Sequence, residues 1–352
     1  MNIKKLQAEL KENQAFLVSS SENRRYLTGF ASSDGYLLVT KSEAVFFIDS
    51  RYIEAAQNII KECSEIILLT SLSAQLKEYA EKLGISTVFT ESERLSVAEF
   101  NRFCTILGCE CIAEKADDAI NALRRTKSEE EKNKILAAQE IAEKAFDHAL
   151  GIIKEGVTER EIALALDFFM LKNGAEGISF ETIAVSGKNS SMPHGVPSDK
   201  KTEKGDFITM DFGAVVDGYH SDMTRTVALG EVSSKQAQVY ETVLAAQIKS
   251  LGSLKAGVTC KAADAAARDI ITEAGYGNFF GHGTGHGVGI EIHEQPRLSP
   301  KSAQILQVGD IVTVEPGIYL PGEFGVRIED MAYITENGFE NLTKSEKSLI
   351  IL

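Results

Sequence analysis

The second half of the sequence contains an internal duplication, which constrains the fold more than any single motif. Three patterns recur in the same order, at offsets of 101, 99 and 104 residues. They are Gly-Val-Thr with a closing glycine (156–174 and 257–275), a histidine three residues before a proline (192–197 and 291–296), and GDxxTxxxG (205–213 and 309–317). Three patterns in register indicate two related halves of about 100 residues. A pseudo-two-fold relation between the halves would bring equivalent residues together in one central cleft.

Each half is predicted to consist of helices followed by antiparallel strands. In 156–174 and 257–275 a threonine can cap the start of a helix and a glycine can end it. The runs FITMD and IVTVE that follow alternate in the manner of strands. Ahead of the first half, Ser128 and Glu131 fit a capping box that opens a long helix through about residue 153.

The first third of the chain is predicted to be a separate α/β domain. We expect an amphipathic helix over the N-terminal residues 1–16. Apolar runs then predict strands at 36–40, 44–49, 65–70 and 86–90, and helical spacing predicts helices at 51–62 and 73–84. The first of these helices would turn one apolar face to the core, formed by Ile53, Ala56, Ile59 and Ile60. The charged stretch that begins at Leu123 marks the boundary, with domains over 1–124 and 125–352.

Four carboxylates occupy matching places in the two halves. Asp211 ends FITMD, and the Asp-Gly turn that follows predicts a hairpin with Asp222 roughly opposite. Glu315 and Glu329 repeat this arrangement around a Pro-Gly-Glu turn. Like charges on facing strands repel, and a buried cluster of anions is costly without cations. Hard divalent metals prefer oxygen ligands, so the pattern predicts a metal site.

A glycine-rich segment, 281–296, adds nitrogen donors. It contains His282, His286 and His293, half of the six histidines in the chain. The alternative is a phosphate-binding loop, but neither GxGxxG nor GxxxxGK[ST] is present. We therefore interpret the segment as a metal or catalytic loop.

The overall charge excludes some function classes. The chain has 51 acidic residues against 37 Lys and Arg, a net charge of −14, which argues against nucleic-acid or anionic-membrane partners. No run of about 18 apolar residues predicts a membrane-spanning helix. An odd number of cysteines, five, behind a lysine-bearing N-terminus without an apolar stretch predicts reduced thiols and a cytoplasmic location.

These residues resemble the metal-ligand set of the pita-bread metallopeptidases, which include methionine aminopeptidase, aminopeptidase P and prolidase. The matching residues, in order and type, are Asp211, Asp222, His286, Glu315 and Glu329. NRRYLTGF (23–30) and DSRY (49–52) resemble the creatinase-type N-terminal domain of the proline-specific branch, which methionine aminopeptidases lack. The resemblance implies a creatinase-like α/β domain followed by a pita-bread α+β domain. Creatinase shares the fold without the ligand set, so the complete set argues against creatinase.

The resemblance further implies a dinuclear site. Asp211 would bind one metal bidentately, Asp222 and Glu329 would bridge both metals, and His286 and Glu315 would complete the other coordination shell. Two divalent metals can supply a bridging hydroxide near neutral pH and polarise the scissile carbonyl. Carboxylate-rich ligation with one imidazole favours Mn²⁺, with Co²⁺ or Zn²⁺ as alternatives.

Two further histidines are candidate catalytic residues. His194 and His293 hold equivalent positions in the two halves, and the resemblance implies that they bind substrate and stabilise the tetrahedral oxyanion. Glu315 is the candidate proton shuttle between the attacking water and the leaving nitrogen, with Glu329 as the alternative.

Three residues are candidates for substrate binding. His282 resembles a family residue at the mouth of the cleft. Arg327 shares a strand face with Glu329, and it either holds the ligand carboxylates in place or contacts substrate. Arg297 resembles the arginine with which prolidases bind the free carboxylate of a dipeptide, a role that suits a guanidinium.

The sequence therefore favours an Xaa-Pro dipeptidase. Aminopeptidase P, which releases the first residue of longer Xaa-Pro peptides, is the close alternative. A non-catalytic peptide-binding module is a third reading, because fold alone does not prove activity, but such modules lose metal ligands and none is missing here. The resemblance also implies a homodimer, with an N-terminal domain that limits substrate length.

Overall fold

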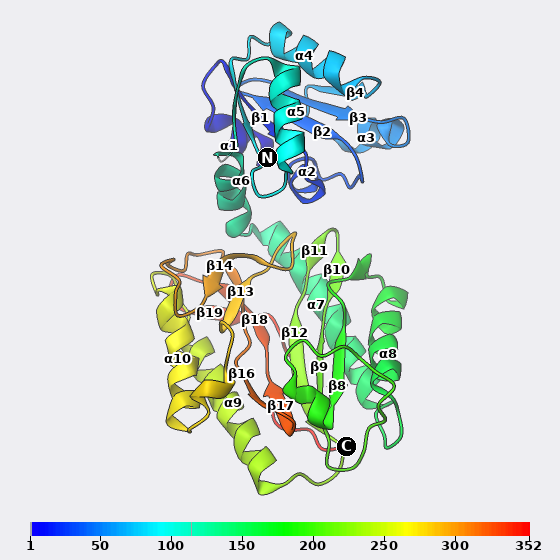
Figure 1. Cartoon of the computed structure of the whole chain (residues 1–352), viewed down its shortest axis with the longest axis vertical. Coiled ribbons are helices and arrows are strands. Elements are labelled where there is room, and N and C mark those ends of the chain that lie inside the picture. The colour runs from blue at the N-terminus through cyan, green and yellow to red at the C-terminus, as the bar shows by residue number, and fades with distance from the viewer. Residues whose placement is uncertain (1, 114) are drawn as a thin grey trace. The chain divides into compact units, whose positions relative to one another are not determined.

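The computed structural model describes residues 2–113 and 115–352. These residues form two compact units, one ending at Arg124 and the other beginning at Arg125 (Figure 1). Each unit has its own sheets and its own core, and we describe them in turn.

The N-terminal unit is built on a six-stranded mixed sheet in the order β4-β3-β2-β1-β5-β6. β1 pairs antiparallel with β2 and parallel with β5. The strands are β1 Gln14–Val18, β2 Tyr36–Thr40, β3 Ala44–Ile48, β4 Glu65–Leu68, β5 Thr87–Thr90 and β6 Glu110–Ile112. The helices are α1 Asn2–Ala8, α2 Ser21–Thr28, α3 Ile53–Ile59, α4 Leu72–Lys82, α5 Val97–Leu107 and α6 Lys115–Arg125. The predicted α/β domain is confirmed, and its four predicted strands agree with the structure to within two residues at each end.

Two details of that prediction are wrong. The N-terminal helix covers only Asn2–Ala8, and β1 begins at Gln14. The segment QAFLV forms a strand because it hydrogen-bonds to β2 on one side and to β5 on the other. The apolar face predicted for 51–62 is also incomplete. The helix ends at Ile59, whose side chain is 55% exposed, and Ile60 reaches the core from the extended segment that follows.

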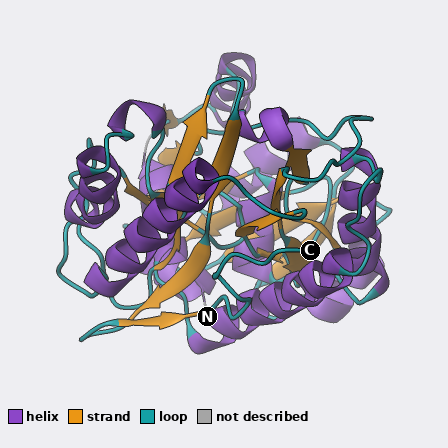
Figure 2. Cartoon of the chain, turned by 90° about the horizontal axis from the view of Figure 1, so that it is seen from below, coloured by secondary structure: helices purple, strands orange, loops and turns teal. Residues whose placement is uncertain are grey.

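The second unit places strands between two pairs of helices. α7 Glu129–Leu150 and α8 Glu159–Lys172 lie on one side of the strands, and α9 Ser234–Ser253 and α10 Cys260–Glu273 on the other (Figure 1). Seen from below, helices flank strands in the same way (Figure 2). The strands of the first half are β7 Gly177–Ile178, β8 Ile183–Ser186, β9 Phe207–Phe212, β10 Ala214–Val216, β11 Tyr219–His220 and β12 Met223–Ala228. Those of the second half are β13 Gly285–Gly287, β14 Glu294–Leu298, β15 Ile311–Val314, β16 Gly317–Leu320, β17 Phe324–Arg327, β18 Asp330–Ile334 and β19 Phe339–Asn341. Short 3₁₀ helices cover Gly187–Ser191 and Gly277–Phe279.

The duplication is visible in the elements themselves. The Thr158 side chain caps α8 and the Thr259 side chain caps α10, as predicted. Gly174 and Gly275 follow these helices with φ angles of 105° and 88°. In each half antiparallel strands come after the helices, with the orders β12-β9-β8 and β14-β13-β15-β18-β19. The α+β prediction is therefore confirmed, and so is the long helix opened by the Ser128 capping box.

The two halves of this unit meet strand to strand. α7 and α8 pack on β9 and β12 in one core, and α9 and α10 pack on β15 and β18 in another. Between these cores the Glu329 amide donates to the Thr224 carbonyl oxygen at 3.1 Å. Among the helices that the structure describes, none combines the length and apolar content needed to cross a membrane.

Candidate metal centre

In the first half, strand register sets the positions of the two aspartates. Asp217 and Gly218, with φ angles of 49° and 81°, form the tight turn between β10 and β11. Counting outward from this turn, Asp211 on β9 pairs with Thr224 on β12. Asp222, predicted to lie roughly opposite Asp211, is therefore two residues away from the directly opposite position. Asp222 still points to the same side of the ladder as Thr224, because side chains alternate along a strand.

In the second half the two glutamates adjoin the end of one strand pair. Val314 at the end of β15 pairs with Asp330 at the start of β18. Glu315 directly follows Val314 and Glu329 directly precedes Asp330, just past the end of that ladder, and the predicted hairpin of β16 and β17 separates them in sequence. Beyond the ladder their amides donate to different partners, Glu315 to the Thr284 carbonyl at 2.8 Å and Glu329 to the Thr224 carbonyl at 3.1 Å.

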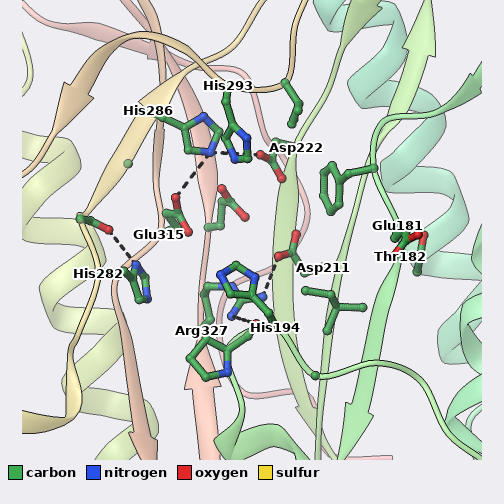
Figure 3. A pocket seen from close by; sticks show the side chains of 18 of the residues that line it. Glu181, Thr182, His194, Asp211, Asp222, His282, His286, His293, Glu315 and Arg327 are labelled. Atoms are coloured by element: carbon green, nitrogen blue, oxygen red, sulfur yellow. Dashed lines mark hydrogen bonds and ion pairs between the residues drawn. The ribbon is translucent and has the colours of Figure 1, made fainter.

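His286 brings a nitrogen donor to the same place. Its strand, β13, passes so close to β15 that a Cβ at Gly285 would lie 1.9 Å from the Thr313 carbonyl oxygen, which explains the glycine. His286 Nε2 lies 3.5 Å from both Asp222 Oδ2 and Glu315 Oε1. Potential ligand atoms of Asp222, His286 and Glu329 all lie within 4.8 Å of one another. Side chains from both halves therefore converge on one point (Figure 3).

Asp211 lies beside this cluster and is held by Arg327. Arg327 Nη2 donates to Asp211 Oδ2 at 2.6 Å, and Nε donates to the Thr224 hydroxyl at 3.0 Å. The second oxygen of the carboxylate, Asp211 Oδ1, is buried without a hydrogen-bond partner among the described residues. Of the two roles open for Arg327, the geometry favours that of a partner holding a ligand carboxylate.

Burial sets the electrostatics of the cluster. It raises the pKa of Asp222 and of Glu329 well above the usual range, and repulsion among the neighbouring carboxylates adds to this effect. It raises the pKa of Glu315 to about 8. Burial lowers the pKa of His286 to about 3, which keeps the imidazole neutral with a lone pair to offer. Buried carboxylates gathered in this way are costly to ionise without compensating positive charge, which a divalent cation would supply.

The remaining predicted residues line one cavity of about 630 Å³ with this cluster. The His293 ring lies 4.5 Å from the His286 ring, while His194 lies near Arg327 and Asp211 (Figure 3). His282 Nε2 lies 2.9 Å from the Tyr319 hydroxyl. Arg297, on β14, lines the cavity with an exposed side chain. The volume falls within the usual range for small-molecule sites, about 300–1,000 Å³.

Comparison with known proteins identifies the family. The profile of metallopeptidase family M24 matches residues 133–336, and that of the creatinase/prolidase N-terminal domain matches residues 2–126. The chain belongs to metallopeptidase family M24. Family membership agrees with the resemblance carried by the five ligand-type residues and with the fold of both units.

Relatives in this family match over almost the whole chain. An Xaa-Pro dipeptidase of Pyrococcus horikoshii is 40% identical, covering 96% of this chain and 94% of the relative. The structure of an Xaa-Pro dipeptidase from Bacillus anthracis matches with a TM-score of 0.96 and 42% identity, covering 100% of this chain and 99% of that one. An X-Pro aminopeptidase from Thermotoga maritima matches with a TM-score of 0.91 and 39% identity, covering 98% and 99%.

The site fits the divalent metal ions that an M24 metallopeptidase uses. Asp211 Oδ1 is a buried acceptor with no partner among the described residues, as a ligand oxygen awaiting a cation would be. Three potential ligand atoms from Asp222, His286 and Glu329 already lie within 4.8 Å of one another, and the imidazole is neutral. Oxygen donors with a single nitrogen suit hard or borderline divalent ions.

Two residues of this M24 site were missed from the sequence. Thr224 donates its hydroxyl to Glu329 Oε2 at 2.7 Å, and Tyr319 places its hydroxyl 3.0 Å from Arg327 Nη1 and 2.9 Å from His282 Nε2. Thr224 could have been predicted from the sequence, because it follows Asp222 by two residues and side chains at that spacing share one face of a strand. Tyr319 carries no such signal, because its partners come from other strands and loops.

Proposed function

We propose that this M24 protein is an Xaa-Pro dipeptidase, which hydrolyses the bond between the first residue and the proline of a dipeptide. The observation that carries the proposal is the convergence of ligand-type side chains from both halves at the wall of one cavity, which two further histidines line. The proposed metal ligands are Asp211, Asp222, His286, Glu315 and Glu329.

We further propose Mn²⁺ as the ion, with Co²⁺ and Zn²⁺ as alternatives. Four carboxylates and one imidazole make a donor set richer in oxygen than usual zinc sites. When bound, divalent ions in such a set lower the pKa of a coordinated water and polarise the scissile carbonyl.

The protein groups then bind the peptide and move protons. His194 and His293 line the cavity and would donate hydrogen bonds to the carbonyl oxygen as negative charge develops on it. Glu315 would accept the proton of the attacking water and pass it to the proline nitrogen, and Glu329 is the alternative carrier. Glu315 directly follows β15 and lines the cavity, which supports this assignment.

Substrate length is the finer question. Arg297 lines the cavity and is suited to a bidentate contact with the carboxylate of the proline in a dipeptide. The names of the relatives from P. horikoshii and B. anthracis favour a dipeptidase, whereas that of the T. maritima neighbour favours an aminopeptidase. Aminopeptidase P activity therefore remains the second candidate.

One assay separates these functions. Purified protein with Mn²⁺ is incubated with Ala-Pro and with Ala-Pro-Ala, and the products are resolved by chromatography. We expect cleavage of Ala-Pro. Cleavage of the tripeptide alone would support aminopeptidase activity. Cleavage of neither peptide would contradict both enzyme functions and favour a non-catalytic peptide-binding module.

We also propose that the protein is a cytoplasmic homodimer whose N-terminal domain limits substrate length. The five cysteines are free, as expected in a reducing compartment. Light scattering coupled to size-exclusion chromatography tests the dimer, because a single chain has a mass of 38.3 kDa.

A further inference from the structure

A buried ion pair lies just outside the proposed metal centre. Lys127 Nζ donates to Glu294 Oε2 at 2.9 Å, and the two side chains are only 1% and 6% exposed. Lys127 follows α6 by two residues, near the start of the second unit. Glu294 directly follows His293. No metal-ligand or catalytic role assigned above requires this pair.

Glu294 folds back across the loop that precedes it. Its Oε1 accepts a hydrogen bond from the Glu291 amide at 3.1 Å. The Gly289 amide donates to the Glu291 carbonyl at 3.0 Å. A Cβ at Gly289 would lie 2.4 Å from Glu294 Oε2, so the backbone packs directly on the carboxylate. The Glu294 carboxylate is therefore the inner support of the loop over residues 288–293.

This loop separates two functional histidines. His286 lies before it on β13, and His293 closes it. Glu294 pairs with Gly287, and the strand register shifts between His286 and Gly287. The rings of His286 and His293 end 4.5 Å apart, at an interplanar angle of 74° (Figure 3). The shape of the loop therefore fixes how His293 is presented to the cavity.

Lys127 is itself held in place. Its amide donates to the Gly309 carbonyl at 2.8 Å, and its Nζ also donates to the Arg125 carbonyl at 3.2 Å. Arg125 in turn makes two 3.0 Å hydrogen bonds to the buried carboxylate of Asp310. Hydrogen bonds of Lys127 and of Arg125 therefore fix the backbone from which the ammonium group reaches Glu294.

We propose that Lys127 is a positioning residue for the reaction, acting on His293 through Glu294. Without the ammonium, a buried carboxylate loses its compensating charge and leaves the loop or takes up water. His293 would then lose its orientation, and small misplacements of a catalytic group cost large factors in rate. This inference rests on the proposed function for its activity readout.

The test compares the wild-type full chain with three variants of it. These are Lys127→Met, Lys127→Arg and, as a matched control, Lys132→Met. Lys132 pairs with Glu340, whose side chain is 45% exposed, in the same unit. For Lys127→Met at saturating Mn²⁺ we expect kcat on Ala-Pro to fall by about tenfold or more with KM changed by less than about threefold. Hydrogen exchange of residues 288–293 should accelerate by about tenfold, while α8 keeps its protection. Lys127→Arg should recover most of the loop protection, and Lys132→Met should match the wild type.

Two results would overturn the proposal. One is unchanged loop exchange and unchanged kcat in Lys127→Met. The other is faster exchange throughout the unit with a normal kcat for the folded fraction, which indicates a structural role alone. If Lys127→Met does not fold, the double variant Lys127→Met with Glu294→Ala, which buries no charge and removes the acceptor of the Glu291 amide, replaces it with the same expected directions. If the wild type cleaves no Xaa-Pro peptide, the proposed function fails, and loop exchange alone decides the positioning role.

Discussion

The two halves of the second unit share one plan but contribute unequally to the metal centre. Both present a helix pair, then antiparallel strands with an acidic residue at matching places, Asp211 and Glu315. Only the second half has the glycine-rich strand that carries His286. In the second half Glu315 and Glu329 each adjoin the last pair of one ladder, Val314 with Asp330, whereas in the first half Asp222 lies two positions from the residue opposite Asp211. The duplication thus repeats the scaffold more faithfully than the ligands.

The halves also support each other's carboxylates. Arg327 of the second half donates to Asp211 of the first at 2.6 Å, and Thr224 of the first half donates to Glu329 of the second at 2.7 Å. Each half thus orients a ligand-type carboxylate of the other. The comparison teaches that the candidate metal centre is formed at the interface between the halves. The following substitutions, some in the first half and some in the second, test this conclusion.

The largest effect is expected from Asp222→Asn. Asp222 lies within the cluster shared by both halves, and its loss should lower kcat/KM on Ala-Pro by about 10³-fold or more. Steady-state kinetics at saturating Mn²⁺ measure this, with the exposed Glu340→Gln as the control. Activity within about tenfold of the wild type would show that the ligand assignment is wrong.

The same variant should be more stable than the wild type when metal is removed. A carboxyl whose pKa is raised on folding destabilises the folded state as pH rises above the unfolded pKa, so at pH 7 the amide relieves that cost. In EDTA we expect the melting temperature to rise by about 2–4 °C, the shift that about 1 kcal/mol produces. With Mn²⁺ the order should reverse, since the wild type gains more from binding.

Arg327→Met comes next, because it removes the tie from the second half to Asp211. The guanidinium is 4% exposed, and deleting it leaves a buried carboxylate uncompensated. We expect a loss of about 3–5 kcal/mol in the free energy of unfolding, measured in urea. The matched Arg160→Met, at an exposed pair with Asp199, should change it by less than about 1 kcal/mol. Equal effects of the two variants would remove Arg327 from the support of the site.

The reciprocal tie is tested by Thr224→Val and Thr224→Ser. Valine keeps the shape but loses the hydroxyl that bonds both Glu329 and Arg327. We expect Mn²⁺ affinity, measured by calorimetry, to fall about 10–100-fold in the valine variant and to stay near the wild type in the serine variant. A valine variant with normal affinity would mean that the first half does not orient Glu329.

What the sequence could and could not predict follows the same division. Asp211 and Glu315 were recognisable because each ends an alternating strand within a repeated pattern. The contacts of Arg327 with Asp211 and Thr224 were not, because they depend on how strands separated by about 100 residues meet, which local pattern does not encode. The N-terminal β1 was missed for a related reason. Its residues follow a helical stretch, and only pairing with β2 and β5 shows that they form an inner strand.

The last change concerns specificity and not the shared centre. Arg297→Ala should lower kcat/KM for Ala-Pro by about 10–100-fold, the value of a charged hydrogen bond, and leave any cleavage of Ala-Pro-Ala nearly unchanged. The ratio of the two substrates is the measurement. An equal loss on both would reject a carboxylate contact for Arg297.

The central claim is that side chains from both halves enclose a pair of divalent ions. Its most direct test is an anomalous difference map from crystals grown with Mn²⁺ and recorded near the manganese edge. We predict two peaks, each touched by carboxylates of both halves, among Asp211, Asp222, His286, Glu315 and Glu329. A map with no peak there, or with metal bound by one half alone, would contradict the account.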